Sequence, residues 1–301
     1  MTPALEVRDV VKRFGDITAV DHLTLSVERG TCFGLLGPNG AGKSTTMRML
    51  TGQAVATSGT ISVLGLDVPR EGKRARARMG VVPQIDNLDL QLTCRANLWA
   101  WAAMYRIPRE KRQAAVDRAL EIASLGDRSN SVAEDLSGGM RRRLLIARGL
   151  IHSPELVLLD EPTVGLDPQV RAELWSLIDQ LRSEGVTIVM STHYIEEAER
   201  LADDVAIMNH GRLVAQGAPE TLLAAHAGVQ AAEFYGSPSR LRQIENAASA
   251  AGLSTRRTGP SISVLRAESV PPSFFDEFDD HVLRASNLED VFVLLTGEGL
   301  E

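Results

Sequence analysis

One segment of the chain reads Gly37-Pro38-Asn39-Gly40-Ala41-Gly42-Lys43-Ser44, and Thr45 follows it. The segment satisfies the pattern G-x-x-x-x-G-K-S, with an apolar run over 31–36 before it and a helix-favouring stretch over 43–52 after it. Glycines let backbone N–H groups curl around phosphate oxygens, and the first turn of a helix adds partial positive charge. The segment therefore predicts a phosphate-binding loop between a strand and a helix, in which Thr45 adds a further phosphate contact.

A metal site and a general base are predicted beside this loop. Lys43 is expected to neutralise the outer phosphates, and the Ser44 hydroxyl to coordinate Mg²⁺. Such an ion needs a nearby carboxylate, which Asp160 supplies at the end of the apolar run 156–159. Because side chains alternate along an extended chain, Asp160 can face the metal while Glu161 faces the attacking water. A purely structural acidic pair is the weaker alternative, since two acids beside an apolar strand are costly to leave unpaired.

A second phosphate contact is predicted at Asp135-Leu136-Ser137-Gly138-Gly139-Met140, which three arginines follow. Ser137 can cap the helix that begins there, while Gly138 and Gly139 expose backbone donors at its positive end. Taken alone, such a helix start is usually only a cap. One nucleotide seldom needs two separate helix termini from one chain, so a second copy of the chain is expected to use this one.

Strand and helix signals alternate along most of the sequence. Short apolar runs predict strands at 60–64, 79–82, 156–159, 186–190 and 205–208. Their alternation with helical patterns, such as 169–184, predicts an α/β fold with a mostly parallel sheet covered on both faces. Residues 85–149 read as helices instead, with one apolar stripe made by Leu98, Trp101, Ala102 and Tyr105. Further predictions are a hairpin over 209–215, helices over 219–227, 241–251 and 288–295, and a strand over 262–265.

Composition and charge narrow the function classes. The 301 residues suffice for about two domains, and 44% hydrophobic with 24% charged residues is an ordinary globular composition. The 32 basic and 39 acidic residues give a net charge of −7, which disfavours a dedicated nucleic-acid binder. Cys32 and Cys94 indicate neither a disulfide framework nor a zinc site. No signal peptide and no membrane-spanning run is expected, so a role at a membrane would need another chain to supply the spans.

Together these motifs resemble the ATP-binding cassette (ABC) family, specifically the nucleotide-binding subunits of ABC transporters. The resemblance runs from about 5 to 225, with the motifs in family order. They are the Walker A loop at 37–44, the Q-loop Gln84, the LSGG signature at 136–139, the Walker B strand ending in Asp160-Glu161, the D-loop Gly165-Leu166-Asp167 and the switch histidine His193.

The resemblance implies a fold and a domain division. It implies a P-loop NTPase domain over 1–227, with a mostly parallel core sheet, an antiparallel N-terminal β part and an inserted helical subdomain at about 85–152. A small C-terminal α+β accessory domain is expected over 228–301. Two such chains would sandwich two ATP molecules, each held between the Walker A loop of one subunit and the signature segment 137–139 of the other. Asp167 is expected among the nucleotide-binding residues.

The resemblance also implies roles for three other side chains. His193 is expected to hold the terminal phosphate and to orient the water beside Glu161. Gln84 is expected to contact both Mg²⁺ and that water, and to open the helical block. Phe14 occupies the place where family members stack an aromatic ring on adenine, with an ordinary buried phenylalanine as the alternative.

Details of the sequence are similar to the ATPases of drug-resistance and nodulation-factor exporters. These details are LSGGMRRRL over 136–144, VPQIDNLD over 82–89 and LEDVF over 288–292. The resemblance implies an ATP-hydrolysing homodimer that drives export through a separate polytopic membrane subunit at the cytoplasmic face of the membrane, without a nucleic-acid partner. The alternative is an ABC protein acting on ribosomes or DNA, but those usually carry two cassettes or a long coiled coil. A P-loop kinase or GTPase would leave the signature and His193 without roles.

Overall fold

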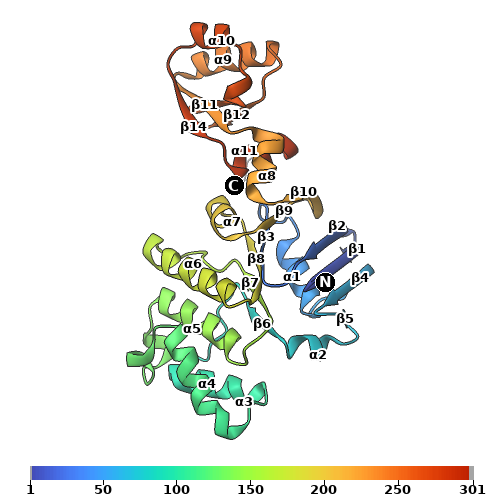
Figure 1. Cartoon of the computed structure of the whole chain (residues 1–301), viewed down its shortest axis with the longest axis vertical. Coiled ribbons are helices and arrows are strands. Elements are labelled where there is room, and N and C mark those ends of the chain that lie inside the picture. The colour runs from blue at the N-terminus through green and yellow to red at the C-terminus, as the bar shows by residue number, and fades with distance from the viewer. Residues whose placement is uncertain (1, 298–301) are drawn as a thin grey trace. The chain divides into compact units, whose positions relative to one another are not determined.

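The computed structural model describes residues 2–297. The chain divides into two compact units, Met1–Leu213 and Val214–Glu301, and each is described here by itself (Figure 1). This division places the residues just after Leu213 with the C-terminal unit. The domain boundary between 227 and 228 stays a prediction.

The first unit is built on a mostly parallel sheet, as predicted. The sheet has the strand order β10-β9-β3-β8-β7-β6, and the pairs β9–β3, β3–β8, β8–β7 and β7–β6 run parallel. The division between the units falls within β10. Strands β3 and β8 are buried along their whole length, because helices and a second sheet cover both faces. The strands are β3 (Cys32–Leu36), β6 (Met79–Val82), β7 (Leu156–Asp160), β8 (Thr187–Thr192), β9 (Asp204–Asn209) and β10 (Arg212–Gly217).

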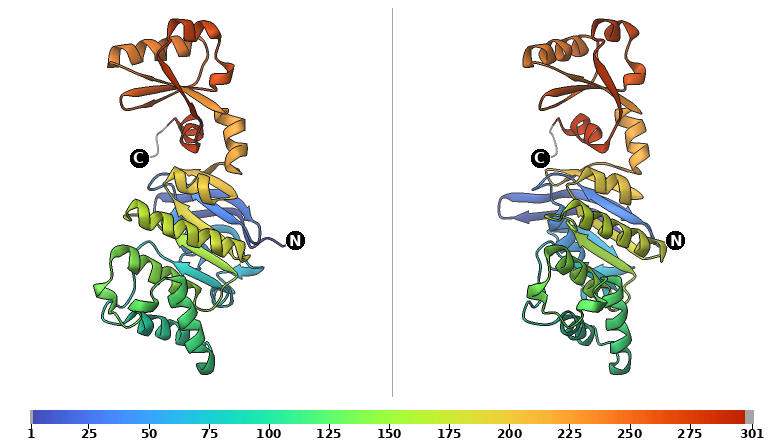
Figure 2. Two further views of the ribbon diagram at one scale, coloured as in Figure 1. Left: turned by 60° about the vertical axis from the view of Figure 1, so that its left-hand side comes forward. Right: turned by 90° about the vertical axis from the view of Figure 1, so that its left-hand side faces the viewer.

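A second, antiparallel sheet has the strand order β2-β1-β4-β5. Its buried side chains join those of the parallel sheet in one core, to which Val7, Val63, Phe33 and Leu158 belong. Helix α1 packs against strands of both sheets and so closes this core (Figures 1 and 2). The elements are β1 (Leu5–Phe14), β2 (Ile17–Val27), β4 (Ser58–Val63), β5 (Leu66–Val68), α1 (Lys43–Leu50) and α2 (Gly72–Arg76).

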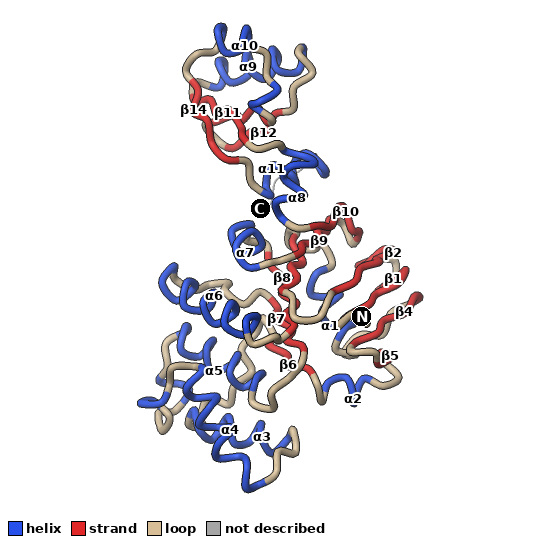
Figure 3. The backbone as a smooth tube through the Cα atoms, viewed as in Figure 1, coloured by secondary structure: helices blue, strands red, loops and turns tan. Residues whose placement is uncertain are grey.

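Helices make up the stretch that the sequence predicted as helical, and they group together in Figure 3. Of the expected apolar stripe, Leu98 and Ala102 are fully buried. Trp101 and Tyr105 are only half-buried, and their rings contact polar side chains. The Arg148 guanidinium group lies over the Trp101 ring, and Tyr105 stacks on His152. The helices of the unit after β6 are α3 (Cys94–Met104), α4 (Arg109–Ile122), η1 (Gly126–Arg128), η2 (Ala133–Asp135), α5 (Gly138–Leu150), α6 (Pro168–Ser183) and α7 (Ile195–Leu201).

The C-terminal unit is an α+β fold with an antiparallel sheet in the order β12-β13-β11-β14. Its core contains Phe234, Phe274 and Phe278. The sequence did not reveal β11, β12 or β14, because β12 contains only polar residues and the other two are short and mix polar with apolar residues. The elements are α8 (Pro219–Leu222), η3 (Leu223–Ala227), β11 (Gln230–Tyr235), α9 (Pro238–Ala250), β12 (Thr255–Thr258), β13 (Ser261–Leu265), η4 (Ala267–Ser269), α10 (Pro272–Glu277), β14 (His281–Ala285) and α11 (Leu288–Thr296).

Candidate nucleotide-binding site

The phosphate-binding loop connects the end of β3 to the start of α1, as the sequence predicted. Two of its glycines cannot be replaced without moving the backbone. A Cβ atom at Gly37 would lie 2.3 Å from the Met208 carbonyl oxygen, and one at Gly42 would lie 2.6 Å from that of Ala19. Gly42 also has φ 99°, which L-residues rarely adopt. The loop therefore keeps its shape through contacts with its neighbours in space.

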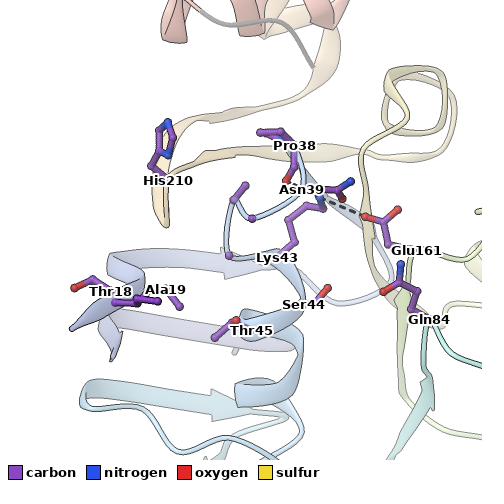
Figure 4. A pocket seen from close by; sticks show the side chains of 14 residues that line it. Thr18, Ala19, Pro38, Asn39, Lys43, Ser44, Thr45, Gln84, Glu161 and His210 are labelled. Atoms are coloured by element: carbon purple, nitrogen blue, oxygen red, sulfur yellow. Dashed lines mark hydrogen bonds and ion pairs between the residues drawn. The ribbon is translucent and has the colours of Figure 1, made fainter. Parts of the chain in front are cut away.

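A pocket of about 480 Å³ lies over this loop (Figure 4). Ten of the residues that line it were predicted as site residues: Pro38, Asn39, Gly40, Ala41, Gly42, Lys43, Ser44, Thr45, Gln84 and Glu161. The other four lining residues were not predicted from the sequence; they are Ile17, Thr18, Ala19 and His210. These four come from the start of β2 and the turn between β9 and β10, so only the fold brings them to the loop.

Lys43 is held on three sides. Its Nζ donates to the carbonyl oxygens of Gly37 at 2.6 Å and Pro38 at 3.1 Å, and lies 3.3 Å from Glu161 Oε1. The side chains of Lys43 and Glu161 are each only 4% exposed. Burial lowers the pKa of Lys43, and the carboxylates of Glu161 and Asp160 oppose that shift. The result is a desolvated cation at the centre of the loop, paired with an acid.

Asp160 meets two hydroxyl groups. Ser44 Oγ donates to Asp160 Oδ1 at 3.2 Å, and Ser191 Oγ donates to the same oxygen at 2.5 Å. The parallel register of β7 and β8 places Asp160 opposite Ser191, while Ser44 comes from the first turn of α1. Hydroxyl and carboxylate oxygens are the ligands that Mg²⁺ prefers, and Gln84, which lines the pocket together with Ser44, adds an amide. The residues present therefore fit the predicted metal.

Glu161 lies just beyond β7, with a left-handed φ of 48°. Its N–H donates to the backbone oxygen and to Oγ of Ser191, both at 3.1 Å. Glu161 and Asp160 do face different partners, but strand alternation is not the cause. The turn at Glu161 separates them, because a residue in this conformation leaves the strand direction. A non-glycine residue held there by surrounding contacts is typical of functional sites.

His193 follows β8 and meets the other oxygen of the same carboxylate. Its Nδ1 lies 2.6 Å from Glu161 Oε2. This contact occupies Nδ1 of the ring. Nε2 then remains for a ligand. Lys43, Glu161 and His193 thus form a continuous chain of contacts, although they come from three separate parts of the sequence.

The other predicted residues lie elsewhere, and among the described residues the pocket lining includes none of them. Ser137 caps α5 by accepting from the N–H of Met140, and Asp167 caps α6 in the same way. A Cβ atom on Gly138 would meet no atom within 4 Å. Phe14 is 51% exposed, and Lys12 Nζ lies 4.6 Å from its ring centre. The nucleotide contacts of these residues, with Gly139, stay predictions.

The sequence analysis missed two charged residues behind the site. Glu197 is buried and accepts from Thr192 Oγ1 at 2.6 Å, from Trp175 Nε1 at 3.4 Å and from Thr163 Oγ1. Arg142 lies behind β7 and bonds backbone carbonyls. Helical spacing does not single out Arg142, because the positions three, four and seven residues after each of Arg141, Arg142 and Arg143 are all buried. No sequence signal marks Glu197.

Comparisons with known proteins agree with this geometry. A family model described as ABC transporter matches residues 20–164. Nod factor export ATP-binding protein I of Ralstonia nicotianae is 41% identical over 305 residues, covering 98% of this chain and 94% of that protein. The protein of the same name from Burkholderia orbicola is 42% identical over 301 residues, covering 99% and 98%.

A solved structure agrees as well. A dimeric ATP-binding cassette in a post-hydrolysis state, bound to ADP and Pi, is 27% identical with a TM-score of 0.65, covering 71% of this chain and 98% of that one. The likeness to the export proteins extends over nearly the whole chain, so it includes both units. The chain therefore belongs to the ABC transporter family, as one of its ATP-binding subunits.

Proposed function

We propose that this chain hydrolyses ATP as a homodimer and thereby drives export through a separate membrane subunit, at the cytoplasmic face of the membrane. The observation that carries the proposal is the chain of contacts from Lys43 through Glu161 to His193, in which the first two side chains are buried and that of His193 is partly exposed. The names of the relatives support the export role. In the described part of the chain, no helix has both the length and the apolar character to span a bilayer.

Binding of ATP would exchange the partners of Lys43. Its ammonium group is shared between two carbonyl oxygens and Glu161. The terminal phosphate of ATP carries more negative charge than a carbonyl group or a single carboxylate. It would therefore attract the ammonium group away from Glu161. Glu161 would then be free of its cation and able to accept a proton. Substrate binding and activation of the base would be coupled in this way.

The oxygens of Ser44, Asp160 and Gln84 would hold Mg²⁺ against the phosphates. When bound, the ion neutralises the charge that develops on the phosphoryl oxygens. The protein positions this set before any ligand arrives, because Ser191 already orients Asp160 through a 2.5 Å hydrogen bond. Ser191 therefore acts on the ligand set through Asp160.

Glu161 would take a proton from the attacking water, and His193 would keep the carboxylate pointing at that water. The contact with His193 Nδ1 occupies Glu161 Oε2, which leaves Oε1 for the proton. Nε2 of the same ring would contact the terminal phosphate. General bases placed in this way contribute about 10²–10⁴-fold to a rate.

A second copy of the chain would complete each site. Ser137 and Gly138 are exposed, and the first turn of α5 presents backbone N–H groups outward. No described residue of the signature segment lines the pocket of its own chain. The dimeric cassette with ADP and Pi supports this arrangement. Two ATP molecules would each be held between one pocket and the partner's signature segment.

Glu161→Gln tests the catalytic part of this proposal. The variant should keep ATP binding but lose turnover by about 10²–10⁴-fold, and ATP should trap it as a dimer. Light scattering after size-exclusion chromatography and phosphate release measure the two effects. Glu155→Gln is the control. Glu155 lies just before β7, at the opposite end of that strand from Glu161, and it pairs with Arg78 and Arg29 outside the pocket. Unchanged hydrolysis in Glu161→Gln would exclude Glu161 as the base.

Purification from detergent-solubilised membranes tests the export part. A tagged full-length chain should bring down a polytopic membrane protein, and the pair in liposomes should hydrolyse ATP faster than the chain alone. Recovery of the chain with ribosomes or DNA, and with no membrane protein, would contradict a transport role.

A further inference from the structure

A single guanidinium group holds two loops of the site together. Arg142 lies in the first turns of α5, and its side chain bonds backbone carbonyl oxygens on two separate segments. Nη1 donates to Pro83 at 2.7 Å and Gln84 at 3.4 Å, Nη2 donates to Asp160 at 3.1 Å and Glu161 at 3.2 Å, and Nε donates to Pro162 at 2.7 Å.

The donor count of arginine matches this set of acceptors. A guanidinium group has five N–H donors in one plane, and five carbonyl oxygens surround Arg142. Three of those carbonyls belong to residues whose side chains are assigned to the metal or the water: Gln84, Asp160 and Glu161. A shift of the guanidinium group would therefore move the backbone from which these side chains project.

Arg142 is a cation in a desolvated place, where hydrogen bonds decide the geometry. Burial lowers its pKa to about 10, against the opposing effect of Asp160, Asp86 and Glu197, so the group stays charged at neutral pH. A buried charge is tolerated only where polar atoms surround it. The carbonyls of both loops must consequently stay in place around the guanidinium group.

We infer that Arg142 is a positioning residue for ATP hydrolysis, which fixes the Q-loop and the end of β7 to the helix that begins with the signature segment. This inference rests on the proposed function, since it assumes that Glu161 is the base. Arg142 would act only through the backbone of the residues that contact water and metal. Its loss should therefore slow turnover more than it weakens ATP binding.

Arg148 offers a matched control on the same helix. Arg148 is buried whereas Arg142 is half-buried, and burial lowers the pKa of Arg148 to about 10 as well. Its guanidinium group contacts Asn87 and lies 4.1 Å from the centre of the Trp101 ring, and these contacts hold α5 to the chain beyond Gln84. No hydrogen bond described for it reaches residues 160–162. Arg148→Met thus removes a buried arginine without releasing the end of β7.

The experiment compares Arg142→Met with Arg148→Met in the full chain. We expect kcat to fall about 10- to 100-fold in Arg142→Met, because small displacements of catalytic groups cost this much. The Kd for ATP from calorimetry should change less than about threefold, since the pocket lining is intact. Both variants should lose thermal stability to a similar extent, whereas Arg148→Met should keep kcat within about threefold of the parent.

Arg142→Lys decides the matter if the methionine variant does not fold. Lysine keeps the charge but has only three donors on one atom, so it can bond at most three of the five carbonyl oxygens. We expect an intermediate kcat with an unchanged Kd for ATP. A parental kcat in either Arg142 variant, an equal loss of kcat in Arg148→Met, or a matching loss of ATP affinity would overturn the inference.

Glu161→Gln, measured alongside, separates the two ideas. If Glu161→Gln retains hydrolysis, the proposed function fails, and with it the basis for a positioning role. If Glu161→Gln abolishes turnover while Arg142→Met leaves kcat unchanged, only the role of Arg142 fails.

Discussion

The phosphate loop and the signature segment differ in their burial and in the contacts that they make within one chain. Around the loop, Lys43 and Glu161 are almost completely buried and bond to each other and to neighbouring carbonyls. In the signature segment, Ser137 and Gly138 are exposed, and space around Gly138 is open. The loop therefore needs only its own fold to be ordered for binding. Under the proposed function, the donors of the signature segment would contact the nucleotide bound by a second copy of the chain.

The largest expected effect separates binding from turnover. Gly138→Asp should leave the Kd for ATP unchanged but lower hydrolysis by about 10²–10³-fold. The substitution places a negative charge where the terminal phosphate of the ATP bound to the second copy would lie. Gly126→Asp is the control, since Gly126 is also exposed and open around its Cβ position. Equal hydrolysis in both variants would show that the signature segment faces no nucleotide.

Lys43→Ala tests the role of the phosphate loop in ATP binding. Loss of a charged hydrogen-bond donor costs about 1.5–3 kcal/mol, so the Kd for ATP should rise about 10- to 100-fold. Calorimetry measures this change directly. Lys73→Ala, which removes an exposed lysine on α2, should leave the Kd unaltered. An unchanged Kd in Lys43→Ala would contradict the phosphate contact of this residue.

The smallest effect distinguishes a cap from a ligand contact. Ser137→Ala and Ser237→Ala each remove an exposed N-cap serine, from α5 and α9 respectively. Each should lower the free energy of unfolding of its unit by about 1 kcal/mol in urea titrations. Only Ser137→Ala should also slow hydrolysis, by less than about tenfold, because neighbouring backbone donors remain. If both variants hydrolyse ATP at the parental rate, the Ser137 hydroxyl is only a cap.

Local patterns predicted much of the first unit and less of the second. The phosphate loop, strand β6 and the buried strands around it were predictable because each is a continuous apolar run or a motif with its own geometry. Strand β12, with the sequence TRRT, was not, because its pairing with β13 rather than its composition makes it a strand. Short polar strands depend on their neighbours, and no neighbour is visible in sequence.

The candidate site shows the same division among its residues. Lys43, Asp160 and Glu161 stand in motifs whose chemistry is readable from residue type and spacing. Ser191 and Arg142 do not, because a serine in an apolar strand and one arginine among three carry no chemical signature. Ser191 reaches Asp160 because of the register between β7 and β8, and Arg142 reaches both loops because of the direction in which its side of α5 faces.

The amino-acid sequence by itself determined the family, the phosphate loop and the identities of the acids and the histidine, since these depend on residue types at short spacings. Only the tertiary structure decided that Lys43, Glu161 and His193 touch, that Ser191 orients Asp160, and that Arg142 joins two loops. These contacts join residues distant along the chain. Their geometry follows from the pairing of parallel strands and the packing of α5 behind them, which no local pattern specifies.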